Sequence, residues 1–191
     1  MQIEYEAIFP NINKDEMQER LKKAGAVLVR PEYLQKRVPF YLPGKKNSGN
    51  SWLRVRDEGD KITLSLKIVD GNKIENQKEL CLEVNNFNEA VSLLKLIGCE
   101  QKSYQESKRE LWKLEGVEIT IDEWPFLESY VEVEGHSEEA VKNVSEKIGF
   151  DWSKAKFCAT GTLIAEKYGI TEEQINDRTP KIVFDMENPY I

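Results

Sequence analysis

Acidic and apolar residues alternate between positions 117 and 135, and this pattern constrains the fold most. Successive side chains of a β-strand point to opposite faces of its sheet, so the alternation predicts two strands, each with one apolar and one polar face. Trp124 and Pro125 interrupt the pattern and separate the two strands. The polar positions are Glu118, Thr120 and Asp122 in the first strand and Glu132 and Glu134 in the second. The sequence therefore predicts a hairpin with an acidic face.

The chain begins with the same alternation. Glu4 and Glu6 alternate with Ile3, Tyr5 and Ala7, which predicts a first strand at about residues 2–9. Acidic strands at the two ends of the sequence indicate a single site formed by both.

The middle of the chain also has a period of two, and several of its polar positions are Arg or Lys. Strands are predicted within residues 34–42, 52–56, 62–68, 79–84 and 105–114, with turns at 43–50, 58–60 and 70–72. Helices with capping residues are predicted from Asn13 to Gly25 and at about 86–97, 137–148 and 159–168.

About eight mostly antiparallel strands with interspersed helices predict an α+β fold, in which the sheet closes or nearly closes into a barrel. Periodicity alone does not say which face lies inside, and a solvated polar face is the simpler alternative. Glutamates, however, cluster on the terminal strands and Arg or Lys on the middle ones. This segregation favours a lumen that holds cations at one wall and an anion at the other.

Composition excludes several classes of protein. A net charge of −7 and a pI near 5.0 argue against bulk nucleic-acid binding, which requires a basic surface. No signal peptide and no apolar run of about 18 residues are found, so no membrane association and a cytoplasmic location are expected. The cysteines are odd in number and lack neighbouring histidines, which indicates reduced thiols rather than disulfides or zinc ligands: Cys81, Cys99 and Cys158.

Five motifs in order resemble the CYTH superfamily, also called the triphosphate tunnel metalloenzymes, over about residues 1–170. The motifs are Glu4-Tyr5-Glu6, Leu53-Arg54-Val55-Arg56, Lys67 at the end of its strand, the 105–109 run QESKR, and the hairpin from Ile121 to Gly135. The superfamily includes class IV adenylyl cyclases, thiamine triphosphatases and inorganic triphosphatases, and the bacterial class IV cyclase-like branch is the most similar.

The resemblance implies an eight-stranded antiparallel tunnel with helices packed outside, which binds a triphosphate-containing small molecule together with Mg²⁺ or Mn²⁺. It implies the metal ligands Glu4, Glu6, Glu132 and Glu134, and catalytic roles for Glu4, Glu6 and Asp122. It implies substrate-binding roles for Arg37, Arg54, Arg56, Lys67, Lys108 and Arg109. Glutamates two residues apart on a strand lie about 6.5 to 7 Å apart, so Glu4 and Glu6 can flank a hard cation.

One position departs from the family signature ExExK, because Ile8 stands where the lysine is expected. The departure is compatible with an altered triphosphate site, with compensation by Arg37 or Lys36, or with lost catalysis. Restoring the lysine is expected to tighten tripolyphosphate binding if residue 8 faces the tunnel. Two functions follow: metal-dependent phosphoryl transfer, as adenylyl cyclase or triphosphatase, or a polyphosphate- or nucleotide-binding module without turnover.

The remaining residues carry weaker signals. His136 is expected on the surface, and Trp124 with Pro125 is expected to form a turn. Glu79 and Glu83 are interpreted either as lumen residues or as ion-pair partners of the arginines. The tail at residues 171–191 is expected to pack on the tunnel domain, to cover one tunnel mouth, or to form a homodimer contact.

Overall fold

The N-terminal strand closes the sheet by pairing with both of its edges. The computed structural model describes residues 1–44 and 51–191, so most of the turn expected at 43–50 lies outside the described residues. The strands are β1 Gln2–Ile3, β2 Tyr5–Phe9, β3 Val27–Phe40, β4 Ser51–Asp57, β5 Ile62–Val69, β6 Gln77–Val84, β7 Tyr104–Leu114, β8 Val117–Glu123, β9 Tyr130–Gly135 and β10 Lys181–Ile182.

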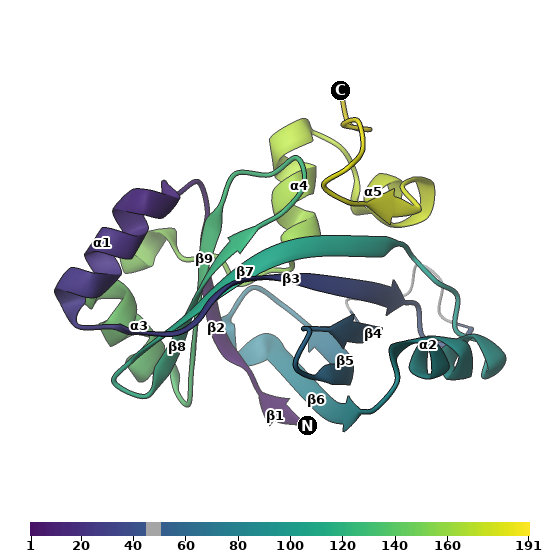
Figure 1. The fold of residues 1–191 in the computed structure, drawn as a ribbon, viewed down its shortest axis with the longest axis horizontal. Coiled ribbons are helices and arrows are strands. Elements are labelled where there is room, and N and C mark those ends of the chain that lie inside the picture. The colour runs from purple at the N-terminus through teal and green to yellow at the C-terminus, as the bar shows by residue number, and fades with distance from the viewer. Residues whose placement is uncertain (45–50) are drawn as a thin grey trace.

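The strand order is β1-β6-β5-β4-β3-β7-β8-β9-β2, and all of these neighbours are antiparallel. Only Glu4 separates β1 from β2 in the chain, so the path that begins at β1 ends beside it at β2 (Figure 1). With β1 and β2 taken as one bent strand, eight strands surround the interior. The expected α+β fold with a nearly closed antiparallel barrel is confirmed.

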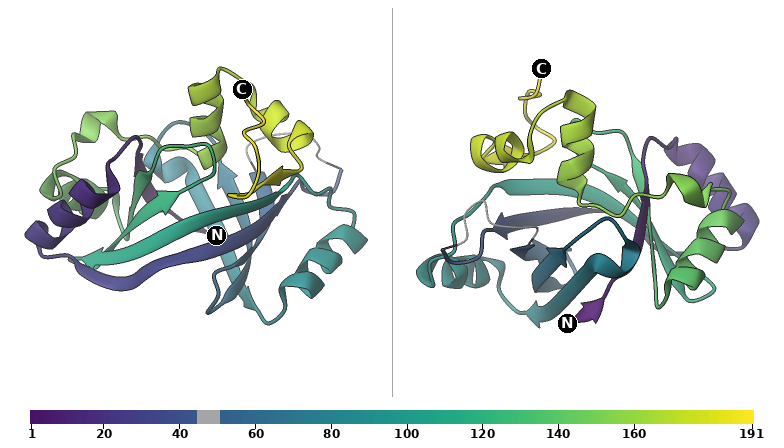
Figure 2. Two further views of the ribbon diagram at one scale, coloured as in Figure 1. Left: turned by 45° about the horizontal axis from the view of Figure 1, so that its top comes forward. Right: turned by 180° about the vertical axis from the view of Figure 1, so that it is seen from behind.

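The described residues form five α-helices outside the barrel, which are α1 Lys14–Ala24, α2 Phe87–Leu96, α3 Glu138–Lys147, α4 Thr160–Tyr168 and α5 Glu172–Arg178. Helices α1 and α3 lie side by side at one end, α2 lies at the other end, and α4 and α5 lie together on a third side (Figures 1 and 2). The predicted caps form, since the Asn13 side chain accepts a hydrogen bond from the Glu16 N–H and Gly25 ends α1 at φ 85°. Among the described residues, no helix combines the length and the apolar character needed to cross a membrane.

The apolar faces of the strands point outward, where α1 and α3 cover one part of the barrel and α2 another. Met17 and Leu21 of α1 and Val141 of α3 pack on the outward side chains of β2, β8 and β9. Ala90 and Leu94 of α2 pack on β3 and β4, whereas Leu93 of the same helix and Ile97 at its C-cap are exposed. The polar faces therefore point inward, as the charge segregation predicted.

The C-terminal segment forms a separate layer beside β7, shown in yellow-green in Figure 1. β10 pairs in parallel with β7, with Lys181 opposite Tyr104 and Ile182 opposite Gln105. Ile164, Ile175 and Ile182 form a small core between α4, α5 and β10. The tail thus packs on the barrel, which is the first of the three arrangements expected for it.

Candidate active site

A cavity of about 340 Å³ lies within the barrel and is lined mainly by polar side chains. Strand parity explains its composition, because every second residue of the surrounding strands points inward. Nine of the residues expected in the site line this cavity: Glu4, Glu6, Arg37, Arg54, Arg56, Lys67, Arg109, Glu132 and Glu134.

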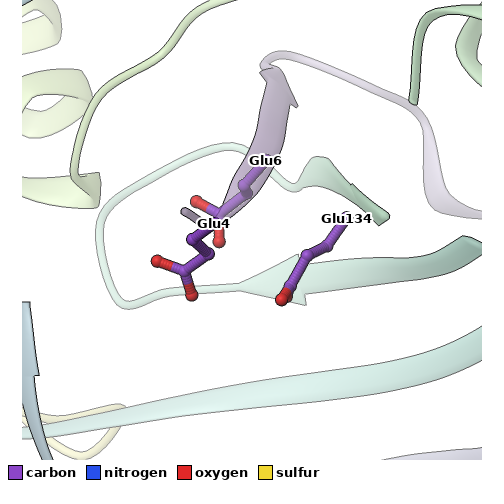
Figure 3. A group of neighbouring side chains, drawn as sticks. All are labelled: Glu4, Glu6 and Glu134. Atoms are coloured by element: carbon purple, nitrogen blue, oxygen red, sulfur yellow. The ribbon is translucent and has the colours of Figure 1, made fainter. Parts of the chain in front are cut away.

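Three carboxylates gather at the closing strand. Glu6 lies directly opposite Glu134 in the β2–β9 ladder, and Glu4 lies in the break between β1 and β2. One carboxylate oxygen from each of Glu4, Glu6 and Glu134 lies within 4.8 Å of the other two (Figure 3). Residues far apart in the sequence thus form one acidic cluster.

The protonation of this cluster reflects crowded negative charge. Burial raises the pKa of Glu4 to about 7, helped by Glu79 and Glu134 and opposed by Lys67. Burial and then Glu132 raise the pKa of Glu6 well above its usual value. Nearby carboxylates that resist ionisation are stabilised by an added cation. An all-oxygen donor set of this kind suits hard divalent ions such as Mg²⁺ or Mn²⁺.

Lys67 joins the acidic cluster to the basic wall. Its Nζ lies 2.7 Å from Glu4 Oε2 and 3.9 Å from Glu6 Oε2. Arg54 and Arg56 point inward from the neighbouring strand β4, where Arg54 pairs with Glu79 at 3.1 Å and Arg56 with Glu58 at 2.6 Å. Glu79 therefore belongs to the cavity and to an ion pair at once, whereas Glu83 is exposed and outside the lining.

Arg109 occupies a second ion-pair network. Its Nε donates to Asp122 Oδ1 at 2.7 Å and its Nη2 to Asp122 Oδ2 at 3.0 Å, while Nη2 also contacts Glu132. Asp122 is fully buried, also accepts a hydrogen bond of 2.6 Å from Thr120, and does not line the cavity. Asp122 was expected to be a catalytic residue, but it lies behind the cavity wall, where it holds Arg109 in place. Glu132 lines the cavity but is turned towards Arg109 rather than into the three-carboxylate cluster.

Arg37 is the most buried cation of the cavity wall, at 5% exposure. Its Nη2 donates to Gln35 Oε1 at 2.6 Å and to Ser107 Oγ, and its guanidinium carbon lies 4.4 Å from the Trp124 ring centroid. Burial, then Arg56, Arg54 and Arg109, lowers the pKa of Arg37 to about 9.

Two basic residues lie elsewhere than expected. Lys108 neighbours Arg109 on β7 and therefore points to the opposite face, where it pairs with Glu32 at 3.3 Å outside the cavity. Lys36 likewise neighbours Arg37 and is exposed. The substrate-binding position expected for Lys108 is not supported, because adjacent strand residues cannot both point inward.

Ile8 also differs from expectation. It lies opposite Glu132 in the ladder and so shares the inward face of Glu6, as its parity predicted. Its side chain is 1% exposed, packs with Trp124, Tyr130 and Leu163, and is absent from the cavity lining. Leu163 comes from α4, so apolar side chains from distant segments fill the inward face here. We call Ile8, Trp124, Tyr130 and Leu163 together the apolar plug. The expected gain in tripolyphosphate affinity from a lysine at position 8 depended on residue 8 facing the tunnel, and the Ile8 side chain does not meet that condition.

The sequence left open whether the tail at residues 171–191 covers a tunnel mouth, and it did not identify which residues of the C-terminal segment line the cavity. Thr160 and Ile164 of α4, Ile175 and Asn176 of α5, and Ile182 of β10 all line the cavity. No local pattern announces this, because it depends on how the segment docks on β7. Trp52 also lines the cavity, and its strand parity with Arg54 would have revealed it.

The comparisons with known proteins agree with this geometry. The family model for the CYTH domain matches residues 2–158. A search of curated proteins finds no match.

Solved structures share the fold at low sequence identity. The PH1012 protein from Pyrococcus horikoshii OT3 superposes with a TM-score of 0.70 at 20% identity, covering 84% of this chain and 98% of its own. A candidate adenylate cyclase from Vibrio parahaemolyticus gives 0.72 at 14% identity, covering 86% and 98%. HpAC1 from Hippeastrum, a candidate adenylyl cyclase with a dominant triphosphatase activity, gives 0.59 at 17% identity, covering 88% and 97%.

Proposed function

Because the chain belongs to the CYTH family, we propose that it is a divalent-metal-dependent enzyme that transfers a phosphoryl or nucleotidyl group from a triphosphate bound inside the barrel. The observation that carries this proposal is one cavity with a cluster of three carboxylates at one wall and several guanidinium and ammonium groups at the other. A polyphosphate requires both, since its oxygens bind cationic side chains directly and hard cations through carboxylates.

The residues divide between two tasks. Glu4, Glu6 and Glu134 would hold Mg²⁺ or Mn²⁺, with Glu132 beside them, and the ion would supply charge neutralisation at the phosphate oxygens. Arg54, Arg56, Lys67, Arg109 and Arg37 would bind and orient the phosphate chain. Asp122 would act through Arg109, whose guanidinium it holds with two hydrogen bonds.

Two reactions suit such a site, and they differ in the attacking group. Attack by water on the terminal phosphorus breaks its bond to the bridging oxygen and releases inorganic phosphate, as expected of a triphosphatase activity such as that of HpAC1. Attack by a ribose 3′ hydroxyl on the α-phosphorus breaks the bond to the β-phosphate, gives a cyclic nucleotide and releases pyrophosphate. Hydrolysis is the form we propose first, because it requires only the polyphosphate contacts present in the cavity.

A binding module without turnover is the second candidate. The apolar plug at Ile8 favours it, because the signature lysine of the family is replaced by a side chain that contacts no ligand space.

The decisive experiment incubates purified protein with ATP, tripolyphosphate or thiamine triphosphate, each with Mg²⁺ or Mn²⁺. Phosphate release and cyclic AMP are measured, with tripolyphosphate binding followed separately by calorimetry. Metal-dependent release of phosphate supports the enzyme, cyclic AMP identifies a cyclase, and tight binding without product supports the module. The proposal would be overturned if the protein neither bound nor turned over any of these compounds.

A further inference from the structure

Arg37 differs from the other cavity cations in the charge of its partners. Arg54, Arg56, Lys67 and Arg109 each contact at least one carboxylate. Within the described part of the chain, Arg37 has no carboxylate at ion-pair distance, although it is almost fully buried. Burying a guanidinium without a counter-ion is costly, so a cation held in this way favours a bound anion.

Neutral groups hold Arg37 in place. Gln35 and Ser107 accept its hydrogen bonds, and Trp124 stacks on its guanidinium. These contacts position the cation without cancelling its charge, which an ion pair would do.

Two donors at this place lack hydrogen-bond partners. The Nε of Arg37 and the Nε1 of Trp124 are buried and unsatisfied among the described residues, and both side chains line the cavity. Trp124 is only 6% exposed, so bulk water does not readily serve its indole N–H. Leaving buried donors unsatisfied costs free energy, so two of them close together favour the binding of an acceptor.

The C-terminal segment covers this end of the cavity. Arg37 lies opposite Gln105 in the β3–β7 ladder, and Gln105 lies opposite Ile182 of β10. Ile182 is fully buried and lines the cavity, so β10 shields this site from solvent. This shielding lies outside residues 2–158, the part matched by the family model.

We propose that Arg37 and Trp124 form a dedicated phosphate subsite, separate from the carboxylate cluster, in which Arg37 supplies the charge and Trp124 positions it and donates a second hydrogen bond. The inference rests on the proposed function and names residues for one phosphate group of its substrate. Ile8 belongs to the same buried apolar cluster as Trp124, so it helps to hold the Trp124 ring in this subsite.

Gln35→Glu is the most discriminating variant. It keeps the shape of the side chain but places a carboxylate where the amide oxygen now lies 2.6 Å from Arg37 Nη2. Arg37 then gains an internal counter-ion, so the affinity for tripolyphosphate should fall about tenfold or more while the melting temperature is maintained or rises. Gln101→Glu is the matched control, because it makes the same charge change at an exposed position outside the cavity.

Two further variants test each donor. Arg37→Lys keeps the charge but loses the planar fork, and Trp124→Phe keeps an aromatic ring but loses the N–H. Both should weaken tripolyphosphate binding by calorimetry, measured with and without Mg²⁺, and the loss should persist without the metal. These variants decide the matter if Gln35→Glu does not fold.

The outcomes separate the two proposals. If the wild-type protein binds tripolyphosphate and folded Gln35→Glu, Arg37→Lys and Trp124→Phe bind it equally well, the subsite is refuted while the proposed function stands. If the variants lose stability but not affinity, Arg37 and its neutral partners have only a structural role, and the subsite is again refuted. If the wild-type protein binds none of tripolyphosphate, ATP and thiamine triphosphate, with or without Mg²⁺, the proposed function fails and the subsite with it; if it binds only one of the latter two, the same variants are compared with that compound.

Discussion

The side-chain amide of Gln77 donates a hydrogen bond of 2.7 Å to the main-chain carbonyl of Glu6. The carbonyl of Gln77 in turn accepts one of 2.9 Å from the N–H of Glu4. One residue of β6 therefore fixes the backbone on both sides of the break between β1 and β2, and with it two carboxylates of the acidic cluster. The contacts that close the barrel therefore also position two carboxylates of the candidate metal site.

Replacing Gln77 with Met should destabilise this closure. Gln77 is 3% exposed, so the variant leaves a buried carbonyl without its donor, at a cost of about 1 to 3 kcal/mol in the free energy of unfolding. Urea denaturation measures the change. Lys78→Ala, an exposed change on the same strand, is the control and should have little effect. Equal stability of Gln77→Met and wild type would show that the closure does not depend on this amide.

Much of the fold followed from local periodicity. A period of two in side-chain direction is a property of each strand alone, so the polar faces that carry Glu6, Arg54 and Lys67 could be predicted before any pairing was known. The segregation of charge between the strands then indicated that these faces lie inside. The same rule, applied strictly, would have excluded Lys108 beside Arg109.

What lies opposite each inward side chain could not be predicted in this way. Ile8 has the inward parity that the sequence gives to Glu6, yet Leu163 of α4 fills the space in front of it. The neutral partners of Arg37 likewise come from three segments: Gln35 from β3, Ser107 from β7 and Trp124 from the turn after β8. Such neighbours are set by the docking of distant segments, which leaves no local pattern in the sequence.

Arg56→Ala should weaken tripolyphosphate binding about tenfold or more, because a charged phosphate contact contributes roughly 1.5 to 3 kcal/mol. Lys108→Ala, a change of equal charge on the outer face of the barrel, should leave the dissociation constant unchanged. Calorimetry compares the two variants after circular dichroism has shown that both are folded. A larger loss from Lys108→Ala than from Arg56→Ala would reverse the assignment of faces.

Glu134→Gln should lower the affinity for Mg²⁺ or Mn²⁺ by about tenfold, because it removes one charged oxygen ligand from the cluster of three. Glu134 is the most exposed of the three, so its replacement should affect stability less than that of Glu6. Metal titration by calorimetry measures the affinity, and Glu83→Gln, on exposed β6 surface, is the control. Unchanged metal affinity in Glu134→Gln would remove this residue from the site.

Cys158 should react slowly with thiol reagents near neutral pH. Burial raises the pKa of its thiol to about 12, and Glu166 and Glu6 add to this against the effect of Lys156. A raised thiol pKa means less thiolate, so only about one Cys158 in ten thousand is ionised at about pH 8, and alkylation should accelerate about tenfold per pH unit above that. Iodoacetamide labelling followed by mass spectrometry gives the rate, with a free-cysteine peptide as reference. Cys158 lines the cavity, and labelling as fast as that of the peptide would contradict the burial of its thiol.

Ile8→Lys should lower the stability of the protein rather than tighten its hold on the ligand. The ammonium group would enter a cluster of Trp124, Tyr130 and Leu163, where a charge without a partner costs several kcal/mol. Thermal denaturation should show a large drop in melting temperature, whereas Ile8→Val, which only shortens the side chain, should cost about 0.5 to 1.5 kcal/mol.

The affinity of the folded Ile8→Lys fraction separates two arrangements of this end of the barrel. If the apolar plug is present, tripolyphosphate binding in that fraction should be unchanged or weaker, because displacing Trp124 also disturbs Arg37. Wild-type stability together with tighter binding would mean that residue 8 reaches the ligand directly. The plug formed with α4 would then be absent in solution, and the signature lysine position would belong to the binding site after all.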